Sequence, residues 1–295
     1  MICPVCDQEK IGERLEVTDH FLSLEKFELV KCACCGMVYT DNPPSPAEIG
    51  KYYDSEGYLS HNDNATGPIS VIYREARKFM LARKRKAIEK LSGLKSGYLL
   101  DIGCGTGHFL EEMSKYGWNV EGVEINEIAR RQAALLTSAN ILDPLELTGL
   151  PSNSFDVITL WHVLEHFHDP RNYMEEIGRL LKPKGICVVA LPNIHSFDAI
   201  HYGDFWAAYD VPRHLWHFSP STFERFATKY GFSIFKIKPL PLDTLFISMM
   251  SEKHKKSRLP MLKGIFIGTW FRLKSIADIK RTSSLIYFLR HKIEE

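Results

Sequence analysis

A glycine-rich stretch, LLDIGCGTGHFLEEM at 99–113, has the residue types and spacing of a cofactor-binding loop. An apolar run leads into Asp101 and is followed by alternate glycines at Gly103, Gly105 and Gly107. Glycines at a strand-to-helix turn let the backbone approach a ligand closely and adopt conformations that a Cβ forbids. The dinucleotide fingerprint requires a glycine where His108 stands. A carboxylate before the first glycine also suits a cation better than a pyrophosphate, so the stretch predicts a different cofactor.

An acidic residue, Glu124, ends the next apolar run, 21 positions after Gly103. A carboxylate at that place in a nucleotide-binding sheet can accept hydrogen bonds from both hydroxyls of a ribose. A helix-capping turn without a ligand is the alternative interpretation, but it explains only the glycines. The loop and the acidic residue together favour a ribose-containing ligand.

Two Cys-x2-Cys pairs near the N-terminus have the spacing of a zinc site. Cys3 and Cys6 form one pair, Cys32 and Cys35 form the other, and Cys34 is a spare thiol. A four-cysteine zinc site is structural, and a segment of about 40 residues buries too little apolar surface to fold without such support. We therefore expect a zinc ribbon with a structural Zn²⁺, and metal-free reduced cysteines are the alternative.

Strands and helices must position these residues, and the sequence indicates where they lie. Short apolar runs alternate with helix-length patterns between about 97 and 240. This alternation predicts a mostly parallel sheet with helices on both faces. A proline-rich stop at 41–46 ends the cysteine segment. The chain is predicted to have four parts, which are a zinc-ribbon-like domain at 1–42, a linker and helical cap at 43–96, an α/β cofactor-binding domain at 97–240, and a basic, partly amphipathic extension at 241–295.

The motifs D-x-G-x-G-x-G and G-V-E resemble those of the class I S-adenosylmethionine-dependent methyltransferases. The resemblance continues through LPSNSFDVITLWHVLEHFHDPRNYMEEIGRLLKPKGICVVALPN and covers about half of the chain. It implies an α/β, Rossmann-like methyltransferase domain with a mostly parallel seven-stranded sheet flanked by helices, a small N-terminal zinc ribbon and a helical C-terminal extension. It also implies an enzyme that takes its methyl group from S-adenosylmethionine. The cofactor-binding residues that it implies are Asp101, Gly103, Cys104, Gly105, Gly107, Glu124, Ile125, Trp161 and His162.

The resemblance also implies roles for some of these residues. The glycine loop would flank the methionine part of the cofactor, Glu124 would hold the ribose, and Asp101 would orient the amino-acid end directly or through water. The third strand is poorly marked, so only Leu145 and Glu146 are offered as adenine contacts.

The acceptor is expected beside the loop after the fourth strand, where this sequence has WHVLEH at 161–166. If a helical turn begins at Trp161, then His162, Glu165 and His166 share one face. An oxygen acceptor with a high pKa needs a base within hydrogen-bond reach. His162 lies nearest the strand and is the first choice for a catalytic residue, whereas Glu165 and His166 either cap the loop or take part in catalysis.

A long insertion after the fifth strand ends in DVPRHLWHFS at 210–219, and loops of this length are usually lids or binding loops. We expect a lid in which Arg213, His214 or His217 acts as a catalytic residue and contacts a polar or anionic acceptor. One alternative is a metal held by the two histidines with Asp210. A nucleic-acid contact is another, and a structural arrangement in which Arg213 pairs with Asp210 is a third.

The same stretch precedes a predicted helix. Ser219 or Ser221 is expected to cap it, with Glu224 completing a capping box. The pattern W…D.PRHL.HFS resembles a bacterial methyltransferase subgroup, which fixes the reaction and leaves the substrate open.

Charge and composition restrict the partners. The net charge of +1 gives no general attraction to nucleic acid or membrane, but the residues from 251 onward carry 11 Lys+Arg against 4 Asp+Glu. The segment 255–292 could therefore contact an anionic membrane surface, although packing on the domain or at a dimer contact is the alternative. Seven cysteines, no signal-like start and no bilayer-length apolar run predict a cytoplasmic protein that could lie at the inner face of the membrane.

Three functions are compatible with these observations. The first is a methyltransferase that acts on an oxygen or carbon atom of a small-molecule, glycan-linked or lipid-linked acceptor. The second is a nucleic-acid methyltransferase that docks RNA through the zinc ribbon and the basic helix at 74–90, although the eight Lys+Arg of that helix are more often a solvated face. The third is a non-catalytic binding protein on the same fold, which the intact glycines and Glu124 argue against.

Overall fold

The computed structural model describes residues 2–53, 68–240 and 242–292. The chain separates into two compact units. The first, named here the ribbon unit, comprises Met1–Ser55, His162–Arg171 and Ala190–Phe288. The second, the glycine-loop unit, comprises Glu56–Trp161, Asn172–Val189 and Leu289–Glu295.

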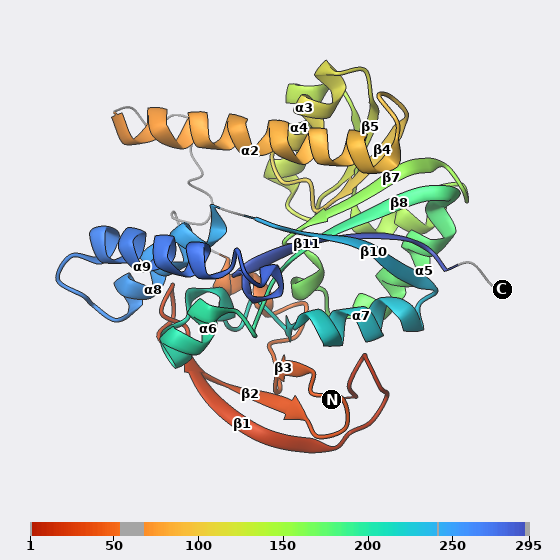
Figure 1. Cartoon of the computed structure of the whole chain (residues 1–295). Helices are drawn as coiled ribbons and strands as arrows, with labels where there is room; N and C mark the ends of the chain where they lie inside the picture. The colour runs from red at the N-terminus through yellow and green to blue at the C-terminus, as the bar shows by residue number, and fades with distance from the viewer. Residues whose placement is uncertain (1, 54–67, 241, 293–295) are drawn as a thin grey trace. The chain divides into compact units, whose positions relative to one another are not determined.

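Seven strands form one mostly parallel sheet in the order β10-β11-β8-β7-β4-β5-β6, and helices flank it as predicted (Figure 1). The last strand, β11, corrects the expectation of a wholly helical C-terminal extension, because the apolar run in SLIYFLRH is a buried strand. The strands are β4 (Tyr98–Ile102), β5 (Asn119–Val123), β6 (Asn140–Leu142), β7 (Phe155–Trp161), β8 (Leu181–Pro192), β10 (Phe232–Pro239) and β11 (Ser284–His291).

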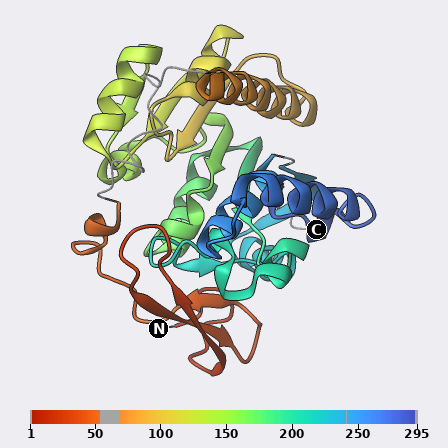
Figure 2. The ribbon, with the colours of Figure 1, turned by 90° about the vertical axis from the view of Figure 1, so that its left-hand side faces the viewer.

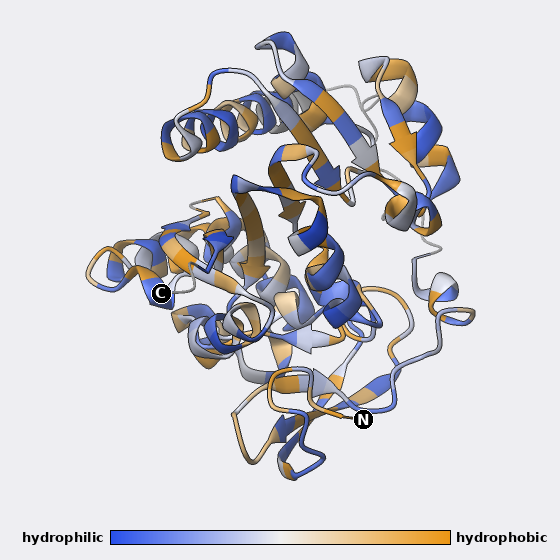
Figure 3. Ribbon diagram, turned by 90° about the vertical axis from the view of Figure 1, so that its right-hand side faces the viewer, coloured by the Kyte–Doolittle hydropathy of each residue, from blue (hydrophilic) through white to orange (hydrophobic). Residues whose placement is uncertain are grey.

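The glycine-loop unit holds the parallel part of this sheet. Strand β4 pairs in parallel with β5 and β7, and β5 pairs in parallel with β6. The strand interiors are hydrophobic along their length, as expected where helices cover both faces (Figure 3). Because parallel strands end at the same edge, the residues after β4, β5 and β6 are brought together there. The helices in this part of the chain are α2 (Pro68–Ser92), α3 (His108–Lys115), α4 (Glu127–Thr137), α5 (Pro170–Leu180) and the 3-10 helix η2 (Pro144–Gly149).

The ribbon unit contains a second sheet, which is antiparallel and has the order β1-β2-β3-β9. Its fourth strand comes from the long insertion, since Val38 pairs with His217 and Tyr39 pairs with Trp216. The ribbon sheet therefore includes part of the DVPRHLWHFS stretch. Its strands are β1 (Ile11–Thr18), β2 (Lys26–Cys32), β3 (Val38–Thr40) and β9 (Trp216–His217).

One hydrophobic core joins the ribbon to the insertion and to the two helices that follow β10. Val17 and Leu29 of the ribbon pack with Trp206 of the insertion and with Ile247 and Phe271 of those helices. The helices of the ribbon unit are α6 (Phe197–Tyr202), α7 (Pro220–Lys229), α8 (Asp243–His254) and α9 (Pro260–Lys274). Short 3-10 helices are η1 (Ile49–Tyr52), η3 (Leu164–His166), η4 (Gly203–Phe205), η5 (Ala207–Tyr209) and η6 (Ile279–Arg281).

Helix α7 begins where the capping signal predicted, but its capping box differs from the expected one. Ser219 is the N-cap, and its side chain accepts a hydrogen bond from the backbone N–H of Thr222. The partner in the box is Thr222, whose hydroxyl accepts from the backbone N–H of Ser219, and not Glu224. Thr222 stands three residues after the cap, a position from which its hydroxyl reaches back to the backbone N–H of Ser219. Pro220 occupies the first helical position, where a proline is well tolerated.

Candidate active site

The three glycines after β4 all have a left-handed backbone, with φ of 74° at Gly103, 55° at Gly105 and 84° at Gly107. Residues with a Cβ rarely adopt these angles. A Cβ at Gly107 would lie 2.9 Å from the Cα of Ala133, so this glycine allows α3 and α4 to approach each other. A Cβ at Gly105 would meet no atom within 4 Å. The backbone at Gly105 therefore borders open space in which a ligand can lie.

Glu124 is held directly beside this loop. Its Oε2 accepts a hydrogen bond of 2.9 Å from the backbone N–H of Gly105, and its Oε1 accepts one of 2.8 Å from the backbone N–H of Asn126. The carbonyl oxygen of Glu124 accepts from Arg130 Nη1 at 2.6 Å. Each carboxylate oxygen keeps a further lone pair. The group is fixed in position and can still accept hydrogen bonds from a ribose.

Asp101 is buried at the end of β4, with 2% of its surface exposed. Burial raises its pKa to about 7, although the hydrogen bond of 2.5 Å that Thr159 Oγ1 donates to Oδ1 acts in the opposite direction. The positive charge of Lys84 also favours the ionised carboxylate. An ammonium group bound next to Asp101 would also lower its pKa. The carboxylate would then be ionised, as it must be to orient the amino-acid end of the cofactor.

Trp161 ends β7 and offers an indole N–H with no acceptor. Its Nε1 is buried and has no hydrogen-bond partner among the residues that the structure describes. The ring is contacted by the edge of Phe109, at 5.3 Å between centroids, and Lys84 Nζ lies 4.0 Å from its centroid. A buried donor without an acceptor is costly, so a bound ligand is its natural partner. The other predicted residues differ in exposure, since Cys104 is buried and the side chain of Ile125 is exposed.

Asp143 has a position that the sequence analysis did not single out. It follows β6 directly, as Glu124 follows β5, and it accepts hydrogen bonds from the backbone N–H of Leu145 and from Arg130 Nη1. Leu145, which was offered as an adenine contact, is 88% exposed, and Glu146 completes the cap of η2. The signal was an acidic residue at the end of the short run Asn-Ile-Leu.

His162 belongs to the ribbon unit and contacts two carboxylates. Its Nε2 lies 3.0 Å from Asp243 Oδ2, and its Nδ1 lies 3.3 Å from Glu165 Oε1. Burial acts to lower the pKa of His162, but the two carboxylates outweigh it and raise the pKa to about 9. The expected helical turn from Trp161 does not form, because His162 has a left-handed φ of 57° and the helical residues are Leu164–His166.

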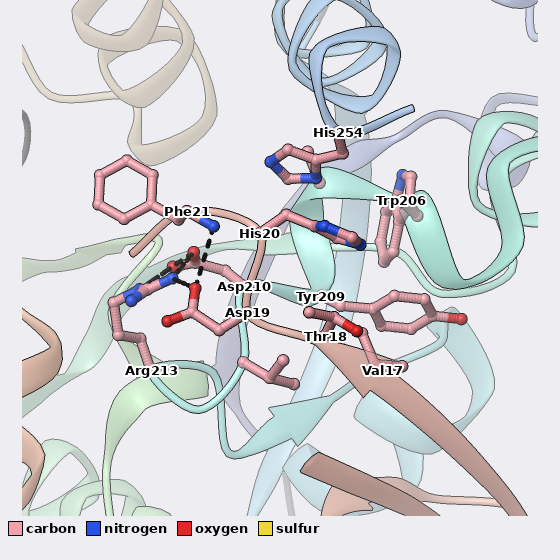
Figure 4. Close-up of a pocket in the computed structure, with 12 residues that line it drawn as sticks. Val17, Thr18, Asp19, His20, Phe21, Trp206, Tyr209, Asp210, Arg213 and His254 are labelled. Atoms are coloured by element: carbon pink, nitrogen blue, oxygen red, sulfur yellow. Dashed lines mark hydrogen bonds and ion pairs between the residues drawn. The ribbon is translucent and has the colours of Figure 1, made fainter. Parts of the chain in front are cut away.

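Arg213 is buried and fully paired, with 1% of its surface exposed. Its Nη2 donates to Asp19 Oδ1 at 2.9 Å and to Asp210 Oδ1 at 2.8 Å (Figure 4). Its Nη1 donates to the carbonyl of Tyr52 at 2.9 Å. The pairing with Asp210 is therefore as the structural alternative predicted. The additional pairing with Asp19, in the turn after β1, ties the insertion to the ribbon. A small pocket opens beside this network and is lined by residues that include His20, Phe21, Trp206, Tyr209 and His254.

The two histidines of DVPRHLWHFS have separate partners, and both are buried. His214 Nδ1 lies 3.0 Å from the carbonyl oxygen of Ala208. His217 Nε2 lies 3.2 Å from Thr40 Oγ1 in the ribbon. Burial lowers the pKa of His217 to about 3, so this ring is neutral. The two rings therefore do not share the single site with Asp210 that was considered as an alternative.

The four cysteines of the two pairs converge in the ribbon. Cys3 Sγ lies 3.4 Å from Cys35 Sγ, and Cys6 Sγ lies 3.5 Å from Cys32 Sγ. All four sulfur atoms lie within 4.8 Å of one another. In a tetrahedral site with Zn–S bonds of about 2.3 Å, the sulfur atoms are about 3.8 Å apart, so the arrangement suits zinc. Cys34 is exposed and stands outside this group.

Comparison with protein families agrees with the cofactor loop. The profile of a family described as "Methyltransferase domain" matches residues 73–237, which is more than half of the chain. A ubiquinone biosynthesis O-methyltransferase from Psychrobacter cryohalolentis is 31% identical over 126 residues, covering 40% of this chain and 48% of that protein. A protein of the same name from Cupriavidus pinatubonensis is 28% identical over 171 residues, covering 54% of this chain and 69% of that protein. The chain thus spans about half the length of several of the curated relatives that it matches.

Solved structures show the same fold. The magnesium protoporphyrin IX methyltransferase of Synechocystis PCC 6803, solved with bound SAH, matches with a TM-score of 0.54. The match covers 83% of this chain and 98% of that one at 12% sequence identity, so the likeness concerns the fold alone. Within the described residues, no helix is long and apolar enough to cross a membrane.

Proposed function

The chain belongs to the methyltransferase-domain family and is an S-adenosylmethionine-dependent methyltransferase. We propose that it methylates an oxygen atom of a small-molecule acceptor. The observation that carries the cofactor assignment is the hydrogen bond from Gly105 to Glu124 beside open space. The names of the relatives support an oxygen acceptor over a carbon acceptor.

The residues present fit the cofactor part by part. Glu124 would accept hydrogen bonds from the ribose hydroxyls, Asp101 would face the amino group, and the indole N–H of Trp161 would donate to an acceptor atom of the ligand. Gly103, Gly105 and Gly107 let the backbone pass close to it. When bound, the cofactor supplies a methyl group on a sulfonium centre, and transfer is an in-line displacement that depends mainly on alignment and exclusion of water.

We propose that His162 is the acid–base residue on the acceptor side. Its contacts with Asp243 and Glu165 hold the ring in place and raise its pKa to about 9. An acceptor hydroxyl would give its proton to Nδ1, where the contact with Glu165 is the longer of the two, and Asp243 at Nε2 would stabilise the imidazolium that results. The predicted roles of Arg213, His214 and His217 in contacting the acceptor remain proposals, and the buried pairing of Arg213 favours a positioning role for that residue.

We also propose a structural Zn²⁺ held by Cys3, Cys6, Cys32 and Cys35. The convergence of the four thiols supports it. The ion would fix the turns on either side of β1 and β2, and through β9 it would fix the loop that carries Arg213 and His214.

The experiment uses the full chain with S-adenosylmethionine labelled on its methyl group. Small phenols and catechols, their prenylated forms, carbon nucleophiles and total RNA are offered separately, and products are identified by mass spectrometry. We expect label in a methyl ether of a small acceptor, and a Glu124→Ala variant that binds the cofactor weakly in calorimetry. Label on a carbon atom or in RNA would overturn the proposed acceptor while leaving the cofactor assignment intact.

A further inference from the structure

Three side chains of the ribbon unit converge from two loops, and we propose that they bind a divalent transition-metal ion. Glu165 and His166 lie in η3, and His214 lies before β9. One potential ligand atom from each residue lies within 4.8 Å of the other two. The two loops are tied together by a hydrogen bond of 2.8 Å from the backbone N–H of Leu215 to the carbonyl of Glu165. This group is separate from the four cysteines and from the glycine loop.

Both histidines are oriented as metal ligands usually are. His166 Nδ1 lies 3.0 Å from the carbonyl oxygen of Arg213, and His214 Nδ1 lies 3.0 Å from the carbonyl oxygen of Ala208. A carbonyl oxygen only accepts, so the ring hydrogen of each neutral histidine belongs on Nδ1, and the Tyr53 hydroxyl oxygen, also 3.0 Å from His166 Nδ1, then accepts from the same N–H. The lone pair is then on Nε2 in both rings. Backbone carbonyls that fix the tautomer in this way are the usual outer partners of metal-bound imidazoles.

The third ligand, Glu165, has a carboxylate that the described residues leave without a hydrogen bond. Its side chain is 0% exposed, and neither carboxylate oxygen accepts a hydrogen bond from any residue in the described part of the chain. Its nearest charged neighbour is His162, with Nδ1 at 3.3 Å from Oε1. A buried carboxylate with so few partners is unfavourable, and coordination of a cation removes that cost.

The donor set indicates the class of metal. Two imidazole nitrogens and one carboxylate oxygen are ligands for Zn²⁺, Fe²⁺ or Mn²⁺, and three protein ligands leave a coordination position for an oxygen atom. Asp210 is the other carboxylate nearby, with Oδ2 at 3.8 Å from His214 Nε2. Its hydrogen bonds to Arg213 assign it to the ion-pair network, so it is not needed as a ligand.

The test counts zinc in the full chain after equilibration with Zn²⁺ and removal of free ion, using elemental mass spectrometry. We expect two ions per chain in the wild type and one ion after Glu165→Gln or His214→Ala. A double Cys32→Ser and Cys35→Ser variant should retain only the second ion. His168→Asn is the matched control, because this exposed histidine lies in the same loop outside the group.

A second measurement guards against variants that misfold. Co²⁺ added to wild type that already holds zinc at its cysteines should produce weak visible absorption without the strong thiolate bands. That signal should disappear in His214→Ala, with circular dichroism unchanged. One zinc per chain in the wild type, lost only with the cysteines, would overturn the proposal.

A different observation carries a second inference, at the hairpin of α8 and α9, whose helices lie side by side (Figures 1 and 2). We propose that the outer face of α9 binds the surface of an anionic lipid bilayer. Gly264 and Gly268 face α8, since a Cβ on Gly264 would lie 2.3 Å from the Cα of Met249. Side chains two positions from these glycines along α9 point to nearly the opposite side of the helix, away from α8. The exposed stripe, at helical spacing, consists of Leu262, Phe266, Trp270 and Leu273.

The charge around this stripe and the length of α9 indicate that its partner is an anionic bilayer surface. The residues from 251 to 275 carry 7 Lys+Arg against one acidic residue, Glu252. Apolar side chains flanked by basic ones fit the boundary between acyl chains and anionic headgroups. Helix α9 has 15 residues, which is too short to span a bilayer, so it would lie along the surface. Phe266 is 77% exposed and Trp270 is 62% exposed, and both are suited to insertion at this boundary.

The test is sedimentation of the full chain with vesicles of phosphatidylcholine alone or mixed with phosphatidylglycerol. We expect binding only to the mixed vesicles, release by high salt, and roughly tenfold or greater weakening by a double Phe266→Ser and Trp270→Ser variant. Leu135→Ser, which removes an apolar side chain that is 86% exposed on α4, should change nothing. Wild type that stays in the supernatant, or forms a dimer that only the stripe variant breaks, would overturn the membrane assignment.

Discussion

The glycine loop and the group of Glu165, His166 and His214 are built in opposite ways. The glycine loop is made from backbone, and each of its parts follows a parallel strand, so that Glu124 reaches Gly105 across neighbouring strands. The other group is made from buried side chains whose positions depend on contacts between distant segments. The glycine loop should therefore keep its geometry when the ribbon unfolds, whereas the group of Glu165, His166 and His214 should lose it.

Removal of the Zn²⁺ proposed for the ribbon is the strongest test of this difference. A chelator or Cys32→Ser should unfold β1 to β3, because metal binding supplies on the order of 10 kcal/mol to small zinc domains. Hydrogen exchange should then show lost protection in the ribbon and around His214. Affinity for S-adenosylmethionine, measured by calorimetry, should change by less than about threefold. An equal loss of cofactor affinity would show that the two sites are not independent.

Loss of Arg213 should have the next largest effect. Arg213→Met leaves Asp19 and Asp210 without their common partner, and breaking a buried ion pair in this way costs about 3–5 kcal/mol. Urea unfolding measures the change in the free energy of unfolding. Arg225→Met is the control, since Arg225 makes one long exposed contact with the carbonyl of Cys35. A similar stability in both variants would contradict the buried network.

Glu124→Ala should weaken cofactor binding without an equal loss of stability. Two hydrogen bonds from a ribose to a charged acceptor contribute about 2–3 kcal/mol, or about 30-fold to 150-fold in affinity. Calorimetry with S-adenosylhomocysteine measures it. Glu127→Ala, three positions further on in α4, is the matched control and should bind as the wild type does. An unchanged affinity in Glu124→Ala would remove the ribose assignment.

The pH profile should show the smallest change. If neutral His162 is the base, then kcat/KM should rise with pH until the pKa of about 9 is passed, because the protonated ring cannot accept a proton. Asp243→Asn removes one of the two carboxylates that raise this pKa, so the rising limb should move to lower pH by about one unit. A limb that stays in place would show that another group titrates.

The sequence predicted the strand and the glycine turn after it because their signals are local. The apolar strand, the glycines and Glu124 lie within one βαβ segment, and their spacing is sufficient to bring them together. Asp143 carried the same kind of signal after a strand of three residues, which was too short to be recognised. Strand β11 was missed for a related reason, since a short apolar run with basic neighbours does not distinguish a buried strand from a helix.

The ribbon side could not be predicted in the same way. Arg213 and Asp19 are 194 positions apart, and no periodicity indicates that they pair. The grouping of His214 with Glu165 likewise depends on the backbone bond from Leu215 to Glu165, between different segments. The expected helical turn at Trp161 failed because β7 continues through that residue and His162 then takes a left-handed conformation.

Strand β9 has only two residues, yet it decides what can be removed from this protein. Deletion of the first 42 residues would take away the strand that pairs with Trp216 and His217, the hydroxyl that bonds His217, and one carboxylate partner of Arg213. A shortened chain would therefore leave the edge of β9 unpaired and the guanidinium of Arg213 without one of its carboxylate partners. We expect such a chain to aggregate. Replacement of the ribbon by another would have to include β9, because β3 and β9 pair with each other.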